Sequence, residues 1–327
     1  MSLPRITAIG SLNMDLVSYV PHHPAPGETL TSNGFTTSPG GKGANQAVAC
    51  AKLSRSSDLS RPTAHVSMVG AVGASDPYGP ALRNSLASFG VDVDGVASRP
   101  DCGTGVAVII VDEPTGENRI MISPEANGSW KPADFDTLPG GDGDGDTLPD
   151  LLIMQLEIPL DAVVQALATA KKAGVPTLLN PAPAQVLPED AYKGLAHLVV
   201  NETEASMLSG KPESELDDEA GLKRTADLFL ARGVQNVIIT LGGRGVYYAS
   251  GVGAKYGLVA AQKTAVVDTT AAGDTFVGSY ALSVVHASFN KTEFDIDAAV
   301  RAANAASAKT VARKGAQVSI PWKDELQ

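Results

Sequence analysis

The stretch DTTAAGDTF, residues 268–276, is the most informative part of the chain, because it joins an expected strand end to an expected helix. We expect a polar strand end at residues 264–268, and a helical spacing of apolar residues follows from Phe276 to Val284. Ala271, Ala272 and Gly273 between them would let a ligand approach the backbone closely. The first amides of a helix lack helical partners and carry the positive end of the helix dipole. The junction therefore predicts an anion site, with phosphate as its commonest occupant.

Asp274 lies in this junction, where a bound phosphate would repel its carboxylate. The position makes chemical sense if the carboxylate takes a proton from a hydroxyl group that attacks a phosphoryl group. The alternative is an ordinary helix N-terminus, in which Ala-Gly-Asp has no ligand. The segment alone leaves both interpretations open.

Along most of the chain on either side of this segment, short apolar runs alternate with helical patterns. The expected strands are residues 6–12, 65–72, 151–156, 177–180, 195–201 and 237–241, with a hairpin at 246–249 and 256–260. The expected helices are residues 44–53, 76–89, 160–173, 202–208, 219–232, 273 onward and 296–309. This alternation predicts an α/β fold, with a mainly parallel central sheet and helices on both faces. Ligands of such folds bind at the carboxyl ends of the strands.

Two segments, at about residues 12–40 and 96–125, have strand and turn patterns without helices. Within the second, residues 105–111 and 119–123 are typical of a hairpin around the turn at 114–117. We expect both segments to form a small β-sheet lid over the site, inserted in a single catalytic domain that spans residues 1–327.

The composition excludes several classes of function. With 25 Lys and Arg against 36 Asp and Glu, the net charge is −11, which disfavours nucleic acid and anionic membranes as partners. Two cysteines, Cys50 and Cys102, make no disulfide framework, and no signal-peptide pattern precedes the first strand, so we expect a cytoplasmic protein. The acidic GGDGDGD run, residues 140–146, lacks the spacing of an EF-hand and is expected to be a loop.

Polar or glycine-rich motifs end most of the expected strands. Asn13 and Asp15 would point the same way on one strand and could bind a polyhydroxyl ligand, although an Asx turn is the alternative. Glu157 closes a buried strand, where an acid is costly unless it is used or paired. Asn201 and Glu204 are spaced to face one ligand or hydrated metal, whereas N-capping would explain one of them and not both.

Two glycine-rich segments are candidates for ligand approach. Residues 39–47, PGGKGANQA, place Gly41, Lys42 and Gly43 before a helix, without the spacing of a Walker A loop. Residues 240–245, TLGGRG, suit a nucleotide cradle, with a plain β-turn as an equal competitor. No G-x-G-x-x-G fingerprint, zinc spacing or Ser-His-Asp pattern is present in the sequence.

Together these motifs resemble those of the ribokinase (pfkB) family of carbohydrate kinases, over nearly the full length. The resemblance is carried by GSLNMDL at 10–16, GGKGANQA at 40–47, NPAP at 180–183, NETE at 201–204, TLGGRG at 240–245, DTTAAGDTF at 268–276 and RKGAQ at 313–317. It implies a ribokinase-like three-layer sandwich with a β-sheet lid. It also implies transfer of the ATP γ-phosphate to O5 of D-ribose.

The resemblance implies roles for individual residues. The sugar would be bound by Asn13, Asp15, Gly41, Lys42, Gly43, Asn45 and Glu157, with Asp274 as base and the amides of Ala271, Ala272 and Gly273 as anion hole. ATP would be bound by Asn201, Glu204, Thr240, Leu241, Gly242, Gly243, Arg244, Gly245 and Asn304, with Asn201 and Glu204 placing Mg²⁺ through water. A K⁺ site would use Asp268, Thr270, Thr310, Arg313, Gly315 and Ser319. A homodimer through the lid sheets is also implied.

Two alternatives remain open from the sequence. The chain could phosphorylate another sugar, a sugar phosphate or a nucleoside, since related kinases share the GGKG and DTTAAGD-like segments. A sugar-binding protein without catalysis is the alternative from another class, although Asp274, Gly273 and Lys42 argue against it.

Overall fold

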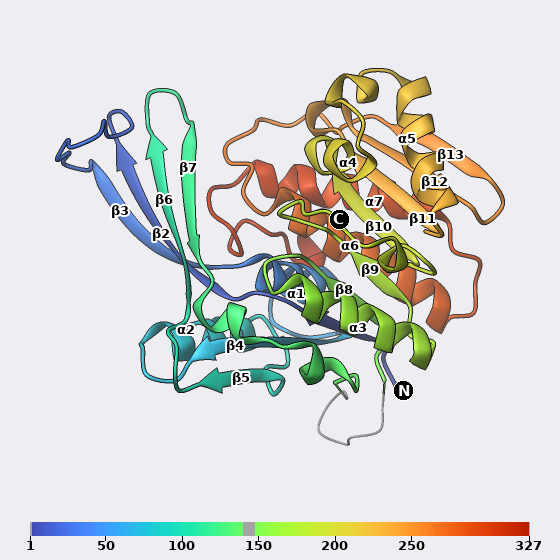
Figure 1. Ribbon diagram of the computed structural model, residues 1–327, viewed down its shortest axis with the longest axis horizontal. Helices are drawn as coiled ribbons and strands as arrows, with labels where there is room; N and C mark the ends of the chain where they lie inside the picture. The colour runs from blue at the N-terminus through green and yellow to red at the C-terminus, as the bar shows by residue number, and fades with distance from the viewer. Residues whose placement is uncertain (1, 140–147, 327) are drawn as a thin grey trace.

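The computed structural model describes residues 2–139 and 148–326. A nine-stranded sheet forms its centre, and Figure 1 shows a four-stranded sheet projecting from one end. The GGDGDGD segment lies outside the described residues. Within the described ranges, no helix has the length and apolar character needed to cross a bilayer.

The large sheet is mainly parallel, as expected. Its strands, in spatial order, are β13 (Lys255–Val259), β12 (Val246–Ser250), β11 (Asn236–Thr240), β10 (His197–Asn201), β9 (Thr177–Leu179), β8 (Leu151–Met154), β1 (Arg5–Ile9), β4 (His65–Gly73) and β5 (Val96–Arg99). All neighbours from β11 to β5 pair in parallel, whereas β12 and β13 add the expected antiparallel hairpin at one edge.

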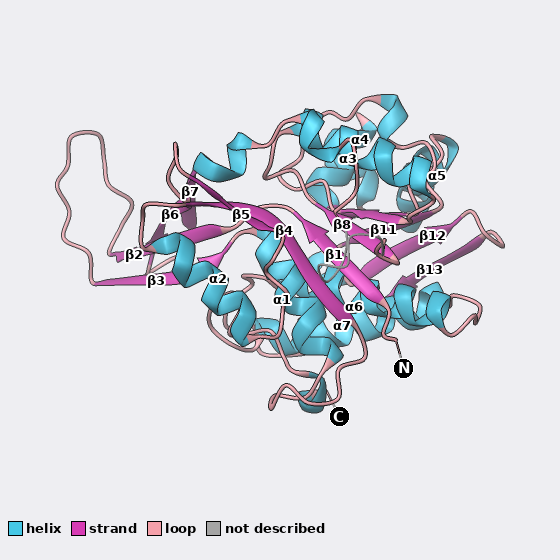
Figure 2. Cartoon of the chain, turned by 90° about the horizontal axis from the view of Figure 1, so that it is seen from below, coloured by secondary structure: helices cyan, strands magenta, loops and turns pink. Residues whose placement is uncertain are grey.

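Helices cover both faces of this sheet, which confirms the three-layer sandwich (Figure 2). One layer holds α1 (Lys42–Ser54), α2 (Tyr78–Ser88), α6 (Ala272–Phe289) and α7 (Ile296–Val311), and the other holds α3 (Leu160–Ala173), α4 (Glu202–Ser209) and α5 (Glu219–Ala231). Side-chain alternation along the strands feeds both layers. In β8, Leu151 and Ile153 join the apolar cluster under α1 and α6, whereas Leu152 and Met154 join the cluster under α3 and α5.

The small sheet consists of β3 (Gly34–Gly40), β2 (Asn13–Val20), β6 (Gly105–Asp112) and β7 (Asn118–Ser123), in that order. The expected hairpin is confirmed by the antiparallel pairing of β6 with β7. The segment expected at 96–125 begins too early, because Val96–Arg99 is β5 and pairs in parallel with β4 of the large sheet. Every residue of β7 is exposed, so the small sheet is much less covered than the large one.

The strand end expected at residues 264–268 is wrong: β13 ends at Val259, and α6 begins only at Ala272. Val266 and Val267 are 65% and 60% exposed, so no apolar layer draws this segment into the sheet. Instead the amides of Val267 and Asp268 donate to the carbonyl of Val311, at the end of α7, at 2.7 and 3.2 Å. The end of α7 therefore holds the segment that leads into α6.

Candidate functional site

The polar residues singled out in the sequence follow parallel strands whose carboxyl ends lie at one edge of the large sheet. Two groups are distinguished below. The α1 side consists of Asn13, Asp15, the start of α1 (residues 41–46), Glu157 and Asp274. The α4 side consists of Asn201, Glu204 and residues 240–245.

Asp274 lies in the first turn of α6 and is only 8% exposed. Asn45 Nδ2 donates to its Oδ2 at 3.1 Å, and Gln46 Nε2 donates to its Oδ1 at 3.0 Å. Burial raises the pKa of Asp274, and this effect exceeds the lowering by Lys42 and by the two amides. A carboxylate with a raised pKa is a better proton acceptor than an ordinary surface aspartate.

The start of α6 has the features of an anion site. Ala271 has a left-handed backbone with φ of 60°, and the amide of Thr275 donates to its carbonyl at 2.8 Å. The amide of Ala272 is turned back toward the carbonyl of Thr269 at 3.2 Å. A Cβ on Gly273 would meet no atom within 4 Å, so the space beside it is open. First-turn amides next to open space suit a bound anion.

Lys42 and Glu157 link α1 to the end of β8. Glu157 Oε2 accepts from Ser11 Oγ at 2.6 Å and from the amide of Lys42 at 3.0 Å, and the ammonium of Lys42 lies 4.0 Å from Oε1. Burial alone would lower the pKa of Lys42, but the surrounding carboxylates, Asp274 first among them, raise it above its usual value. Lys42 therefore stays charged among acids.

Asp15 is part of the same acidic group. Burial, together with the carboxylates of Glu157 and Asp274, raises the pKa of Asp15 to about 7, against the opposing effect of Lys42. The side chain therefore changes its charge near neutral pH, and its ionised form is the destabilised one.

Glycines bring the start of α1 close to the end of β1. Gly41 has φ of +90°, and a Cβ there would lie 2.7 Å from the amide nitrogen of Asn13. A Cβ on Gly43 would lie 2.6 Å from the amide nitrogen of Ser11. Side chains at these two positions would push α1 away from β1, so the glycines are required for the close approach.

Asn13, with 3% of its surface exposed, is held by a residue that the sequence analysis did not select. Asn127, in the short helix η1 (Glu125–Ser129), donates through Nδ2 to Asn13 Oδ1 at 2.8 Å. Its Oδ1 accepts from the amide of Leu12 at 2.9 Å. Asn127 therefore fixes the start of β2 and leaves the Nδ2 group of Asn13 facing elsewhere.

On the α4 side, Asn201 and Glu204 form a capping box. Asn201 Oδ1 accepts from the amide of Glu204 at 2.8 Å, and Glu204 Oε2 accepts from the amide of Asn201 at 2.9 Å. The expectation that capping explains only one of them is wrong, because a Glu three residues after the cap can reach back to the cap's own amide. Burial raises the pKa of Glu204 even so.

Residues 240–245 form a tight turn after β11. The amide of Leu241 donates to the carbonyl of Gly245 at 2.8 Å, and a Cβ on Gly242 or Gly243 would meet nothing within 4 Å. The Arg244 guanidinium points to Glu202 and to the carbonyls of Leu216 and Asp217. The Arg244 guanidinium is therefore held by other protein groups.

The remaining residues of the expected nucleotide site lie near this turn or on α7. Thr240 Oγ1 donates to the carbonyl of Val200 at 3.3 Å. Asn304, on α7, donates through Nδ2 to the carbonyl of Ala260 at 2.7 Å. Backbone carbonyls therefore hold the side chains of both residues in place.

Asp268 contacts two other residues of the expected cation site, Thr270 and Gly315. Its carboxylate accepts from the amides of Thr270 at 2.9 Å and Gly315 at 2.8 Å. Burial raises the pKa of Asp268, but these hydrogen bonds outweigh it and lower the pKa below its usual value. The carboxylate therefore joins the segment before α6 to the loop after α7.

The other expected cation ligands offer oxygen atoms, which suit hard cations. The Thr310 carbonyl accepts from the amide of Arg313 at 3.0 Å, and Ser319 Oγ donates to the carbonyl of Ala316 at 2.7 Å. The guanidinium of Arg313 is paired with Glu325. The Asp268 carboxylate and the Thr310 carbonyl are thus oxygen donors of the kind that K⁺ would need, whereas the Arg313 side chain is not.

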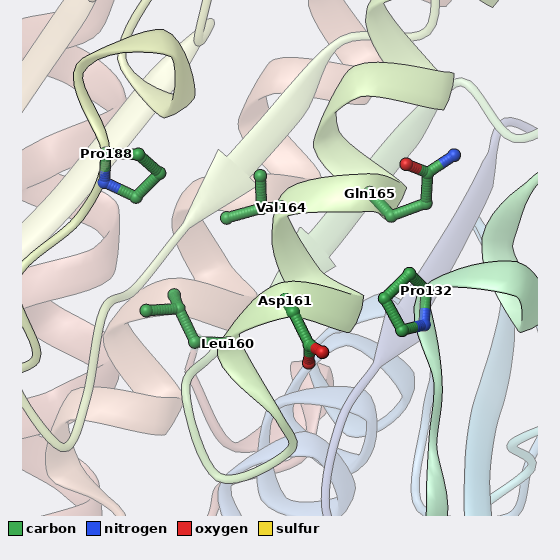
Figure 3. A pocket seen from close by; sticks show the side chains of 6 residues that line it. All are labelled: Pro132, Leu160, Asp161, Val164, Gln165 and Pro188. Carbon is green, nitrogen blue, oxygen red and sulfur yellow. The ribbon is translucent and has the colours of Figure 1, made fainter.

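A hollow away from the site gives no competing candidate. It has a volume of about 660 Å³ and is lined by Pro132, Leu160, Asp161, Val164, Gln165 and Pro188 (Figure 3). Its polar groups are already engaged: Asp161 accepts from the amide of Ala162, and Gln165 donates to Asp136. In the two described ranges, no group of three or more His, Cys, Asp or Glu residues is arranged to bind a metal.

Several carboxamides around Asp274 were not selected from the sequence: Gln46, Gln155, Asn180 and Gln317. Gln46, Asn180 and Gln317 are within quoted motifs, and Gln155 directly follows a buried strand, so these positions were available signals. Gln317 donates to Asn45 Oδ1 at 3.2 Å, across 272 positions. No local pattern announces that contact.

Known proteins resemble this chain over nearly all of its length. The pattern of the family described as pfkB family carbohydrate kinase matches residues 3–323. The ribokinase of Schizosaccharomyces pombe is 44% identical over 320 residues, which cover 97% of this chain and 95% of that protein. A deoxyribokinase of Salmonella typhi is 33% identical over 317 residues, covering 97% and 95%.

The solved structure of Arabidopsis thaliana ribokinase, complexed with ribose and ATP, has a TM-score of 0.82 at 30% identity. The alignment covers 100% of this chain and 98% of that one. Fold, site geometry and family pattern therefore lead to one conclusion: the chain belongs to the pfkB family of carbohydrate kinases.

Proposed function

We propose that the chain is an ATP-dependent ribokinase, which converts D-ribose to D-ribose 5-phosphate. The observation that carries this proposal is the buried carboxylate of Asp274, held by Asn45 and Gln46 in the first turn of α6. The similarity to ribokinases, one of them solved with ribose and ATP, supports the same substrates here.

In the proposed reaction, O5 of ribose attacks the γ-phosphorus of ATP, the bond to the β-phosphate oxygen breaks, and ADP leaves. Asp274 takes the proton of the attacking hydroxyl, and its raised pKa suits that task. The amides of Ala271, Ala272 and Gly273 would stabilise the charge on the transferred group, after the Ala272 amide has turned away from the Thr269 carbonyl. Such transfers need positioning and charge stabilisation more than covalent chemistry.

The two sides of the site would bind the two substrates. Ribose would be held on the α1 side by Asn13, Asp15, Gly41, Lys42, Gly43, Asn45 and Glu157. ATP would be held by Asn201, Glu204, Thr240, Asn304 and the turn at residues 241–245, where Gly242 and Gly243 leave open space. Mg²⁺, when bound, would neutralise phosphate charge, with Asn201 and Glu204 reached through water.

We further propose that K⁺ binds at Asp268, Thr270, Thr310, Arg313, Gly315 and Ser319 and stiffens the loop before α6. Asp268 supports this because it already joins that loop to Gly315. Equal turnover in K⁺ and Na⁺ at one ionic strength would contradict it.

The small sheet would act as a lid of a single catalytic domain. It would also pair two copies in a homodimer, and we expect the protein in the cytoplasm.

The central test is Asp274→Asn, which keeps the shape of the side chain and removes the base. We expect kcat for ribose phosphorylation to fall at least about a hundredfold, with ATP binding largely retained. Turnover is measured by coupled ADP release, and ATP binding by calorimetry. Near-normal turnover would refute the role of Asp274.

The second candidate is deoxyribose as substrate, which the Salmonella deoxyribokinase favours. A panel of ribose, deoxyribose, fructose, fructose 6-phosphate and adenosine decides the substrate by kcat/KM. If no member of the panel is phosphorylated at saturating Mg²⁺ and K⁺, a sugar-binding protein without catalysis becomes the better interpretation.

A further inference from the structure

A chain of carboxamides, buried at Gln46 and Gln155 and partly buried at Asn180, connects Asp274 to the backbone of the central sheet. Asn180, the residue after β9, donates through Nδ2 to the carbonyl of Val199 in β10 at 2.9 Å. Its Oδ1 accepts from Gln46 Nε2 at 3.0 Å, and the same nitrogen donates to Asp274 Oδ1 at 3.0 Å. Gln155, which is fully buried, donates through Nε2 to Gln46 Oε1 at 2.6 Å.

The direction of every hydrogen bond in this chain follows from one backbone carbonyl. The Val199 carbonyl can only accept, so Asn180 must turn its NH₂ group toward β10 and its oxygen toward Gln46. Gln46 must then present its NH₂ group, which also reaches Asp274. The two ends of a carboxamide have nearly the same shape, so hydrogen bonding and not packing sets this orientation.

A reversed Gln46 would be unfavourable at three contacts. Its oxygen would face Asn180 Oδ1 and the Asp274 carboxylate, and its NH₂ group would face the NH₂ group of Gln155. Each contact would pair two groups of the same kind away from water, where unmade hydrogen bonds are costly.

Gln155 does not by itself determine the orientation of the Gln46 amide. Its Oε1 has no hydrogen-bond partner among the residues that the structure describes. That atom lies so close to Gly10 that a Cβ there would come within 2.1 Å of it. The amide of Gln155 is therefore held in place by packing against Gly10, and its bond to Gln46 reinforces the orientation that Asn180 imposes.

We propose that Asn180 is a positioning residue for phosphoryl transfer: through Gln46 it fixes the amide donor that holds the Asp274 carboxylate in place. Gln155 secures the far end of Gln46. The inference rests on the proposed function, because it concerns Asp274 as the base.

Uncharged substitutions isolate this effect. Asp274 is faced by four charged side chains from other elements: Lys42 on α1, Asp15 on β2, Glu157 after β8 and Glu204 on α4. Asn180→Leu leaves all of them unchanged and removes both hydrogen bonds of the Asn180 side chain. A change in the titration of Asp274 then reports the freed Gln46 amide.

The experiment compares the pH dependence of kcat/KM for ribose in the wild type, Asn180→Leu, Gln46→Met and the double variant. We expect Asn180→Leu to lower kcat/KM about tenfold at pH 7 and to move the acid limb upward by about one pH unit. The shift is expected because the ionised carboxylate of Asp274 has lost a hydrogen bond in this variant. We expect the double variant to match Gln46→Met alone, since Asn180 acts through Gln46.

Asn236→Leu is the matched control. Asn236, at the start of β11, donates through Nδ2 to the carbonyl of Ala196 at 3.0 Å, at the opposite ends of the strands. It should lower Tm to a similar degree without moving the acid limb. Asn180→Ala replaces Asn180→Leu, with the same expectation, should the larger side chain prevent folding.

An acid limb that stays in place in the Asn180 variant, or an effect that adds in full to that of Gln46→Met, would overturn the proposal. Either result, with an inactive Asp274→Asn, leaves the proposed function standing. Near-normal turnover of Asp274→Asn would instead refute Asp274 as the base, and a wild type that phosphorylates no sugar would overturn the proposed function.

Discussion

The α1 side and the α4 side of the site hold their polar groups in different ways. On the α1 side, hydrogen bonds join residues far apart in sequence: Asn45 and Asp274 are 229 positions apart, and Gln46 and Gln155 are 109 apart. On the α4 side the bonds of the Asn201–Glu204 cap and of the turn at residues 241–245 are local, and the side chains of Thr240 and Arg244 bond to Val200 and Glu202, 40 and 42 positions away.

The geometry of each side therefore has a different physical origin. The α1 side depends on the packing of α1 and α6 against the sheet, and it gathers three acids, Asp15, Glu157 and Asp274, around Lys42 at a cost in stability. The α4 side depends on backbone turns that form from neighbouring residues. Disturbing tertiary packing should therefore affect the α1 side far more than the α4 side.

The largest difference is expected from adding one methyl group to each side. A Cβ on Gly43 would lie within 2.6–2.8 Å of backbone atoms of Ser11 and Gly10, whereas one on Gly243 would meet nothing within 4 Å. We expect Gly43→Ala to lower the free energy of unfolding by about 2 kcal/mol or more, and Gly243→Ala by less than about 0.5 kcal/mol.

Urea unfolding and kcat for ribose measure both variants. Activity should fall with stability in Gly43→Ala, because the same methyl group displaces Lys42 and Asn45. Similar losses in the two variants would break the distinction between the two sides.

A smaller effect, of opposite sign, is expected from Asp15→Asn. Between pH 3.8 and about 7, folded Asp15 keeps a proton that the unfolded chain has lost, so its contribution to stability falls as pH rises. Above pH 7 the penalty is complete, and the neutral amide avoids it. We expect a gain of about 1–2 kcal/mol at pH 8, discounted for partial solvent contact, and almost none near pH 4.

Thermal unfolding at several pH values measures this gain, and kcat/KM for ribose should fall in the same variant. A gain that is equal at pH 4 and pH 8 would show that Asp15 is not a strained acid. The acids of the α1 side would then cost less folding stability than we infer.

The smallest effect is expected on the α4 side. Asn201→Ala removes the cap of α4 and should lower the free energy of unfolding by about 1 kcal/mol. Asp218→Ala, which removes the cap of α5, is the control. Both should lose similar stability, but only Asn201→Ala should raise KM for ATP. Equal KM values would leave Asn201 with capping alone.

Local sequence patterns were enough to predict the layers of this protein and the local parts of its site. Apolar periodicity predicted α3 at residues 160–173 and the β12–β13 hairpin, because each pattern reports the burial of its own segment. The glycine turn at 240–245 and the cap at Asn201 were also visible, since their bonds join neighbouring residues.

Long-range packing, in contrast, sets how the carboxamides are arranged around Asp274 and why residues 264–268 form no strand. Gln155, Asn180 and Gln317 come together through strand order and helix packing, which leave no trace in local spacing. Residues 264–268 have strand-like composition, but the amides of Val267 and Asp268 donate to the end of α7 and not to a neighbouring strand. Hydrogen bonds between distant segments depend on which surfaces pack together, and local pattern does not specify that choice.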